Sequence, residues 1–242
     1  TFLFLLGSML MRSAGCIVND IVDKNFDKRV ERTKNRPIAS GKVSVKLAII
    51  YSFVLCGLAF LVLVNFNKFT ILMAMLSMPF AFTYPLMKRF TYWPQLFLGI
   101  TFNYGLVLAW ISINNSISIV SIIFYLGAIF WTLGYDTIYG YQDIKDDEII
   151  GVKSTSIKFK KNPKIFISLC YLFFFISLII TGILMSFKIL YFLTLIITFL
   201  HLLIYQIKNL NVDDANQCLQ KFKSNNFLGL IVFLNILIGK II

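Results

Sequence analysis

The segment Phe2–Gly41 reads FLFLLGSMLMRSAGCIVNDIVDKNFDKRVERTKNRPIASG. Within it the composition changes from apolar to charged, and this change decides the fold. Its first part, Phe2–Val18, is mostly apolar and long enough to cross a bilayer as a helix. Its second part, Asn19–Gly41, holds four acidic residues and six Lys or Arg residues. An apolar run that ends in a dense group of charges is typical of a transmembrane helix that reaches the membrane surface.

The rest of the chain repeats the apolar part of this pattern. The 242 residues have a mean hydropathy of +0.81 and only 14% of them are charged, against about 25% in soluble domains. Eight apolar runs have membrane-spanning length: Phe2–Val18, Val45–Val64, Phe69–Met87, Trp93–Ile113, Ile117–Tyr135, Ile165–Phe187, Ile189–Ile207 and Phe227–Ile242. None alternates like a barrel strand, so the sequence predicts an all-α integral membrane protein, a bundle of eight transmembrane helices.

Basic residues are concentrated in alternate connections between these runs. Nineteen of the 23 Lys and Arg residues fall in four segments, 24–46, 88–89, 145–164 and 208–223. The opposite connections hold only Lys68 and Lys188. This is the positive-inside pattern, which places the charged loops in the cytoplasm or the equivalent compartment of an organelle. It also explains the net charge of +12, so we expect the lipid bilayer as a partner and no nucleic acid.

The orientation bears on the start of the chain. With the basic loops inside, the first span enters the membrane from the outer side, and the chain begins with Thr without a signal peptide. We therefore expect residues 1–242 to be a single domain whose N-terminal helix is missing, with nine spans in the parent protein. No Gly/Pro-rich linker divides the chain.

Acidic residues are scarce, and nine of the eleven lie in two clusters on the basic side. The first comprises Asp20, Asp23, Asp27 and Glu31. If the first span continues as a helix, its three aspartates share one face. Carboxylates aligned in this way favour a hard cation such as Mg²⁺, which typically takes one or two carboxylates plus substrate phosphates. The alternative is a solvated loop whose acids pair locally with basic neighbours.

The second cluster lies in YDTIYGYQDIKDDEIIGVKST, residues 135–155. The spacing of Asp136, Asp143 and Asp147 predicts another single helical face. Two carboxylate rows at the same membrane surface can hold Mg²⁺ ions around one diphosphate, and basic side chains can neutralise its outer oxygens. The candidates for this basic role are Arg36, Lys88, Arg89 and Lys153. A diphosphate site at the mouth of an apolar bundle suits an isoprenyl diphosphate.

The ordered motifs resemble those of the UbiA family of membrane prenyltransferases over essentially the whole chain. NDIVDKNFD at residues 19–27 looks like the family's NDxxDxxxD motif, and DIKDD at 143–147 resembles its DxxxD motif. YPLMK at 84–88 is similar to its YxxxK element. The flanking segments MRSAGC, ERTKNRPIASG and GVKST look like the 4-hydroxybenzoate polyprenyltransferase branch.

The resemblance implies a role for each matching residue. Ligands of Mg²⁺ and diphosphate would be Asn19, Asp20, Asp23, Asp27, Asp143 and Asp147. Substrate-binding residues would be Arg12, Arg36, Tyr84 and Lys88, with Arg12 binding the carboxylate of the acceptor. Turnover is expected to depend most on Asp23, Lys88, Asp143 and Asp147, with Asp143 as the first candidate for the base. Asn103 interrupts a span, and either contacts the aromatic acceptor or bonds across helices.

The resemblance thus implies a Mg²⁺-dependent enzyme around a central prenyl-diphosphate cavity. It would transfer a polyprenyl group to the ring of 4-hydroxybenzoate, ortho to the phenol and meta to the carboxylate, on the route to ubiquinone. Other acceptors (haem, homogentisate, a naphthoate) remain alternatives, as do an ion-coupled transporter and a structural membrane subunit. A bacterial inner membrane is the first expectation for its location, and the mitochondrial inner membrane the second.

Overall fold

The computed structural model describes residues 2–241, and each regular element in this range is helical. Its long elements are α1 (Phe2–Asp27), α2 (Val45–Leu63), α3 (Lys68–Thr83), α5 (Pro94–Asn114), α6 (Ile119–Gly140), α9 (Pro163–Leu184), α10 (Ile189–Leu200) and α11 (Ala215–Ile241). The π-helix η2 (His201–Lys208) continues α10. The short elements are η1 (Tyr84–Leu86), α4 (Met87–Phe90), α7 (Ile144–Ile150) and α8 (Thr155–Lys158).

The prediction of an all-α membrane bundle is confirmed. Within residues 2–241, eight helical segments are long and apolar enough to cross a membrane, and they match the eight predicted runs. The two largest differences in their boundaries are that α1 continues past Val18 to Asp27, and that α11 begins at Ala215 rather than Phe227. Ile242, the predicted end of the last span, lies outside the described residues. The ninth span expected ahead of residue 1 stays a prediction.

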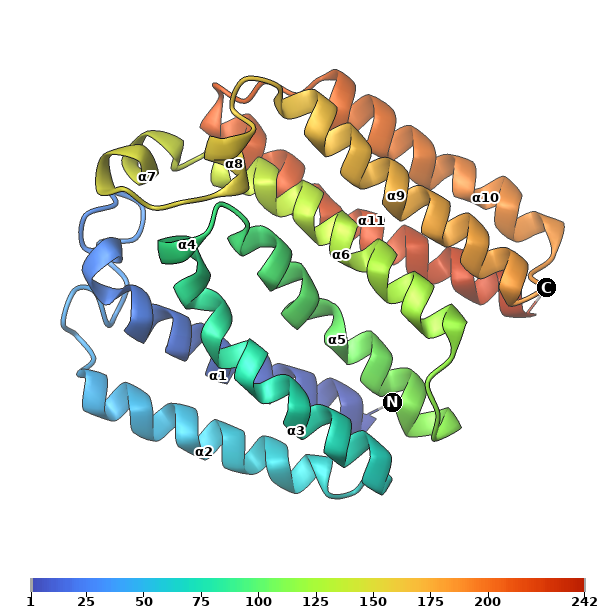
Figure 1. The fold of residues 1–242 in the computed structure, drawn as a ribbon, viewed down its shortest axis with the longest axis horizontal. Helices are drawn as coiled ribbons and strands as arrows, with labels where there is room; N and C mark the ends of the chain where they lie inside the picture. The colour runs from blue at the N-terminus through green and yellow to red at the C-terminus, as the bar shows by residue number, and fades with distance from the viewer. Residues whose placement is uncertain (1, 242) are drawn as a thin grey trace.

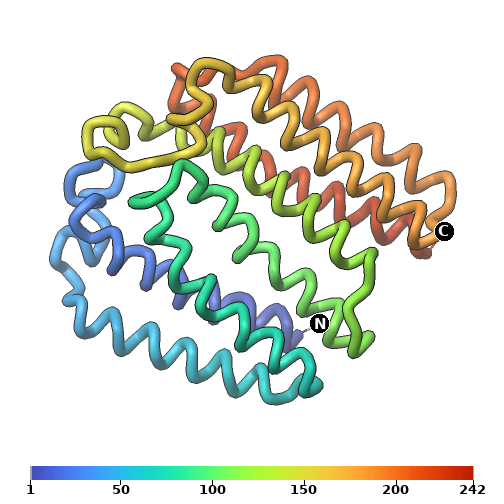
Figure 2. Tube along the Cα trace, in the orientation of Figure 1, coloured from blue at the N-terminus to red at the C-terminus, as the bar shows by residue number. Residues whose placement is uncertain are grey.

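The long helices run alongside one another, and their connections separate into two ends (Figures 1 and 2). One end carries α4, α7 and α8 together with the connection between α1 and α2. The two chain termini lie toward the other end. The first end is the one that the basic loops predict for the inner side of the membrane.

The half of the bundle formed by α6, α9, α10 and α11 is tightly packed. Its core includes Tyr171, Phe174 and Leu178, all of them 2% exposed or less. Helices α6 and α9 approach so closely that a Cβ at Gly134 would lie 2.5 Å from Cε1 of Tyr171. A Cβ at Gly127 would lie 1.6 Å from a side-chain oxygen of α9. Glycine at these positions therefore sets the distance between the two helices.

The other half surrounds a cavity instead of a core. Helices α1, α2, α3 and α5 line an apolar cavity of about 1210 Å³, which Tyr135 and Asp136 of α6 and Phe222 of α11 also line. Of the whole of α1, only Ala14, Asp23 and Asp27 are fully buried within the described residues. The fold thus combines a rigid helical block with a large internal space, and the two carboxylate clusters lie at one end of that space.

Candidate functional site

The two carboxylate clusters meet in a second, smaller cavity of about 300 Å³ at the end of the bundle that carries α4, α7 and α8. Asp23 and Asp27 line it from α1, and Asp143 and Asp147 line it from the region of α7. The structure therefore brings together residues that are more than a hundred positions apart in the sequence. This outcome agrees with the expectation that both rows face one membrane surface.

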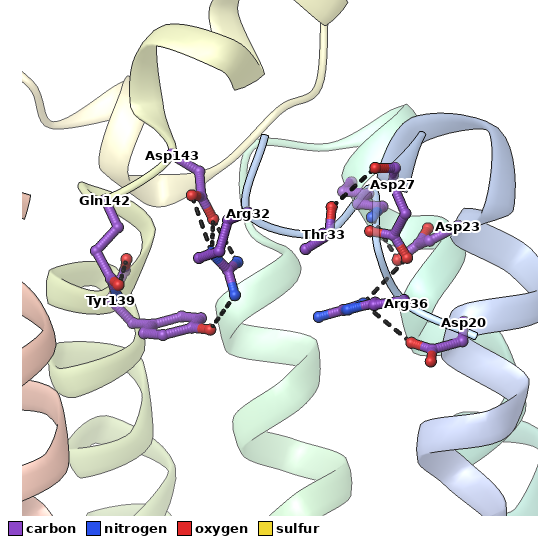
Figure 3. A network of polar contacts seen from close by, with 10 residues as sticks. Asp20, Asp23, Asp27, Arg32, Thr33, Arg36, Tyr139, Gln142 and Asp143 are labelled. Atoms are coloured by element: carbon purple, nitrogen blue, oxygen red, sulfur yellow. Dashed lines mark hydrogen bonds and ion pairs between the residues drawn. The ribbon is translucent and has the colours of Figure 1, made fainter. Parts of the chain in front are cut away.

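The first carboxylate row forms because α1 continues as a regular helix to Asp27. The same guanidinium nitrogen of Arg36, Nη1, donates to Asp20 at 2.9 Å and to Asp27 at 3.0 Å (Figure 3). Asp23 pairs instead with Lys88, whose Nζ lies 2.5 Å from Oδ2. Asp23 is only 3% exposed and its other oxygen, Oδ1, has no hydrogen-bond partner.

The second row is not a continuation of one helix, so the prediction of a single helical face is wrong. Helix α6 ends at Gly140, and Asp143 immediately precedes the short helix α7 that carries Asp147. The break occurs where Gly140 packs so tightly that an added Cβ would lie 2.4 Å from Oγ of Ser156. The chain turns there, and α7 lies across the end of the bundle (Figure 1).

An arginine that the sequence reasoning did not single out joins the two sides of the site. Arg32 lies in the α1–α2 connection, and its Nε donates to both carboxylate oxygens of Asp143 at 3.0 Å. Its Nη1 donates to the hydroxyl of Tyr139 at 2.8 Å (Figure 3). The available signal was its position four residues before Arg36, in the segment ERTKNRP.

Ion pairs dominate the electrostatics of the site, although they do not include Asp147. Among residues 2–241 no three acidic, His or Cys side chains are arranged to hold a metal ion. Arg32, Arg36 and Lys88 pair with carboxylates of both rows. Burial, and then the neighbouring Asp143, raise the pKa of Asp147 to about 6. The hydrogen bonds that Arg32 donates to Asp143 raise the pKa of Arg32 above its ordinary value.

The residues nevertheless fit Mg²⁺. The donors are carboxylate oxygens, which this hard cation prefers. The buried Oδ1 of Asp23 is an acceptor without a donor, and such an atom is costly unless a cation or donor completes it. The basic side chains that now pair with the acids are of the kind that binds phosphate oxygens.

Most of the other predicted residues also line one of the two cavities. Asn19, Arg36, Tyr84, Lys88 and Lys153 line the smaller one. Arg12 lines the larger one, where its guanidinium lies 5.3 Å from the ring centre of Phe102. Asp20 lines neither cavity and contacts the site through Arg36.

Two predicted substrate-binding residues are placed elsewhere. Asn103 lines neither cavity; its Nδ2 donates to Oγ1 of Thr132 at 2.7 Å and to two backbone carbonyls, so it joins α5 to α6. This corresponds to the alternative that it bonds across helices. Arg89 lines neither cavity either, because its Nη2 donates to the carbonyl of Val22 at 2.7 Å and its guanidinium lies over Phe26.

Asp136 is the acidic residue whose position the sequence reasoning undervalued. It lies near the end of α6 and lines both cavities, as do Tyr84 and Leu98. The boundary between the polar and the apolar cavity is therefore at Asp136. Its place in the second acidic cluster indicated a functional role. Because one continuous helix was assumed, Asp136 was grouped with Asp143 and Asp147 and was not given a role of its own.

The model of the UbiA prenyltransferase family matches residues 1–236. The chain belongs to this family. The UbiA member from Homo sapiens named 4-hydroxybenzoate polyprenyltransferase, mitochondrial, is 42% identical over 99% of this chain and 64% of its own length. The protein of the same name from Drosophila melanogaster is 42% identical over 99% of this chain and 61% of its own length. This UbiA chain thus spans about three fifths of the length of these relatives.

Solved UbiA structures share the fold. The apo structure of a UbiA homolog from Aeropyrum pernix K1 superposes with a TM-score of 0.83 at 22% identity, covering 98% of this chain and 88% of that one. A UbiA homolog from Archaeoglobus fulgidus, bound to GPP and Mg²⁺, superposes with a TM-score of 0.69 at 19% identity, covering 99% and 87%. These similarities support the helical architecture of the bundle.

Proposed function

We propose that this protein transfers a polyprenyl group from polyprenyl diphosphate to the ring of 4-hydroxybenzoate, ortho to the phenol and meta to the carboxylate, on the route to ubiquinone. The observation that carries the proposal is the junction at Asp136 of a small charged cavity with a large apolar one. Such a junction suits a substrate with a charged head and a long apolar tail. The names of the 42% identical relatives supply the acceptor.

The head of the substrate would lie in the smaller cavity. Mg²⁺, when bound, would neutralise the diphosphate and make it a better leaving group. Its ligands would be Asn19, Asp23, Asp27, Asp143 and Asp147, which line this cavity, together with Asp20, which Arg36 joins to it. Because Arg32, Arg36 and Lys88 already lie on these carboxylates, they are within reach of the phosphate oxygens of the same complex. The positive side chains would then stabilise the negative charge that grows on the departing diphosphate.

The tail would lie in the larger cavity, where little water competes with the reaction. The allylic carbon–oxygen bond breaks, its electron pair stays on the diphosphate oxygen, and an allylic cation remains. The ring carbon ortho to the phenol forms the new carbon–carbon bond, and the ring then loses its proton. Asp143, the base first expected, is held by Arg32 inside the polar cavity. Asp136 is the better candidate for the base, because it lies at the boundary where the bond forms.

Arg12 would orient the acceptor. It lines the larger cavity from α1, seven residues before Asn19, which corresponds to about 10 Å along the helix axis. Among residues 2–241 no carboxylate forms an ion pair with Arg12, whereas Asp20 and Asp23 are paired with other cations. Its guanidinium is therefore available to bind the carboxylate of an aromatic acid through two parallel hydrogen bonds.

For the location, the relatives favour the second of the two expectations. Both of the named relatives are described as mitochondrial, so we propose the mitochondrial inner membrane rather than a bacterial one. The acidic clusters would then face the matrix, which is the compartment that the positive-inside pattern equates with the cytoplasm.

The test is an assay of the purified full-length protein with labelled polyprenyl diphosphate and a panel of acceptors. We expect 3-polyprenyl-4-hydroxybenzoate as the product, lost on chelation of Mg²⁺ and in Asp147→Asn. The matched control is Asp213→Asn, a change in an exposed loop away from both cavities. Transfer to homogentisate or a naphthoate in preference to 4-hydroxybenzoate would refute the proposed acceptor, and the absence of any transfer would refute the reaction.

A further inference from the structure

Phe222 of α11 is an aromatic residue at the boundary of the two cavities that the mechanism above does not use. It lines the larger cavity. Its ring centre lies 5.7 Å from that of Tyr135, in an edge-to-face arrangement, and 4.4 Å from that of Tyr139, in a tilted one. Its ring therefore bridges two successive turns of α6 on either side of Asp136.

These contacts define the level at which the ring lies. Tyr135 lines the apolar cavity, Tyr139 lines the polar cavity, and Asp136 lines both. A residue that touches both tyrosine rings lies at the height of the boundary between head and tail. In a prenyl diphosphate that boundary is the allylic carbon–oxygen bond, so the ring of Phe222 lies at the height of the bond that breaks.

The position of Phe222 is fixed by its neighbours on α11. Lys221 is only 3% exposed, and its Nζ donates to the carbonyl of Tyr205 in the π-helix η2. Gln206 donates back to the carbonyl of Lys221 at 2.9 Å. Asn225 accepts a 2.8 Å hydrogen bond from Nε1 of Trp131 on α6. These bonds set the register of α11 against η2 and α6, so the ring of Phe222 is held in place before any substrate arrives.

We propose that Phe222 is a catalytic residue that stabilises the allylic cation through the face of its ring. This inference rests on the proposed function. The negative face of an aromatic ring attracts a cation within about 6 Å, most strongly where water is excluded. The phenylalanine ring carries no hydroxyl, so it stabilises the cation without being able to capture it. The tyrosines beside it, Tyr135 and Tyr139, lack this advantage.

The test separates the effect of the negative electrostatic potential at the ring face from the effect of the shape of the ring. Phe222 is replaced by 4-fluoro-, 3,5-difluoro- and 3,4,5-trifluorophenylalanine through site-specific incorporation into the full-length protein. Fluorine withdraws electrons from the ring face with little change in size. Single-turnover rates with polyprenyl diphosphate and 4-hydroxybenzoate report the chemical step. We expect the logarithm of this rate to fall steadily with each added fluorine, while the KM for polyprenyl diphosphate stays nearly constant.

Phe222→Leu should lower the same rate by about 2- to 30-fold, the range that a cation–π contact supplies. The matched control is Phe173, which stacks on Phe130 at 4.9 Å and lines neither cavity. Fluorination of Phe173 should leave the rate unchanged, and thermal melts check that each variant is folded. A flat series at Phe222 in an enzyme whose wild type is active overturns this inference alone. If the wild type does not transfer the prenyl group of polyprenyl diphosphate to any acceptor, the proposed function is overturned, and this inference with it.

Discussion

The position of Arg12 makes a quantitative prediction about the acceptor. In Arg12→Lys the charge stays but one arm of the guanidinium fork is lost. A hydrogen bond to a charged group contributes about 1.5 to 3 kcal/mol, so losing one of two should raise the KM for 4-hydroxybenzoate about tenfold. In Arg12→Gln both the charge and the second bond are lost, and a cost of about 3 kcal/mol corresponds to a rise of about 150-fold.

The assay measures initial rates with the purified full-length protein while each substrate is varied in turn. Polyprenyl diphosphate should keep its KM, because the nearest predicted ligand of its head, Asn19, lies about 10 Å from Arg12 along α1. Arg29→Lys, in the exposed part of the α1–α2 connection, serves as the matched control and should change neither KM.

A second acceptor sharpens the result. 4-Hydroxybenzamide keeps the phenol and the ring but lacks the carboxylate, so it should be a poor substrate for the wild type. Replacing Arg12 by Gln should cost little further with this amide, because the interaction is already gone. The reasoning is refuted if the substitutions raise the KM for polyprenyl diphosphate and leave that for 4-hydroxybenzoate unchanged, since Arg12 would then serve the diphosphate site.

Three further predictions concern the acidic site and the packing of the bundle. Asp23→Asn should lower kcat/KM about 100-fold or more at an unchanged melting temperature, because the partly exposed Lys88 can be hydrated when its partner loses charge; a parallel fall of the melting temperature would indicate a structural role. Burial raises the pKa of Asp147 to about 6 from 3.8, so the metal-free protein should lose stability as the pH rises from about 4 through 6. Its affinity for Mg²⁺ should weaken as the pH falls below about 6, because the protonated carboxyl group is a poor ligand. Thermal melts and Mg²⁺ titrations at pH 5 and 7.5 check the two directions, and pH-independent values would contradict them. Gly134→Ala should destabilise the protein by about 1 to 3 kcal/mol with little change in either KM, because its Cβ would lie 2.5 Å from Tyr171, and an unchanged unfolding curve would contradict the close packing of α6 on α9.

Several features could be predicted from the sequence because they depend on neighbouring residues alone. The eight spans follow from apolar runs of membrane-spanning length, and the structure has eight helices of that kind within residues 2–241. The first carboxylate row follows from helical periodicity, since α1 continues without a break from Phe2 to Asp27. The shared end of the two acidic clusters follows from counting the spans between them and from the basic loops.

Other features depend on contacts between residues that are far apart in the sequence, and helical periodicity does not predict such contacts. The second row is broken at Gly140, where the close packing of Ser156 turns the chain, so the assumed single face does not exist. Asn103 is directed toward Thr132 rather than toward the acceptor, because α5 packs against α6 at this position. Asp136 lies at the boundary of the two cavities because α6 borders both.

The sequence by itself therefore determined the membrane class, the eight spans within residues 2–241 and the two groups of carboxylates, and it predicts the sidedness of the spans. Hydropathy and helical periodicity depend only on residues that are close together in the sequence, so they can be predicted without knowledge of the tertiary contacts. Tertiary structure alone decided which cation meets which acid. Arg32 contacts Asp143 across 111 residues of chain, and only the folding of the α1–α2 connection over the end of the bundle brings the two side chains together.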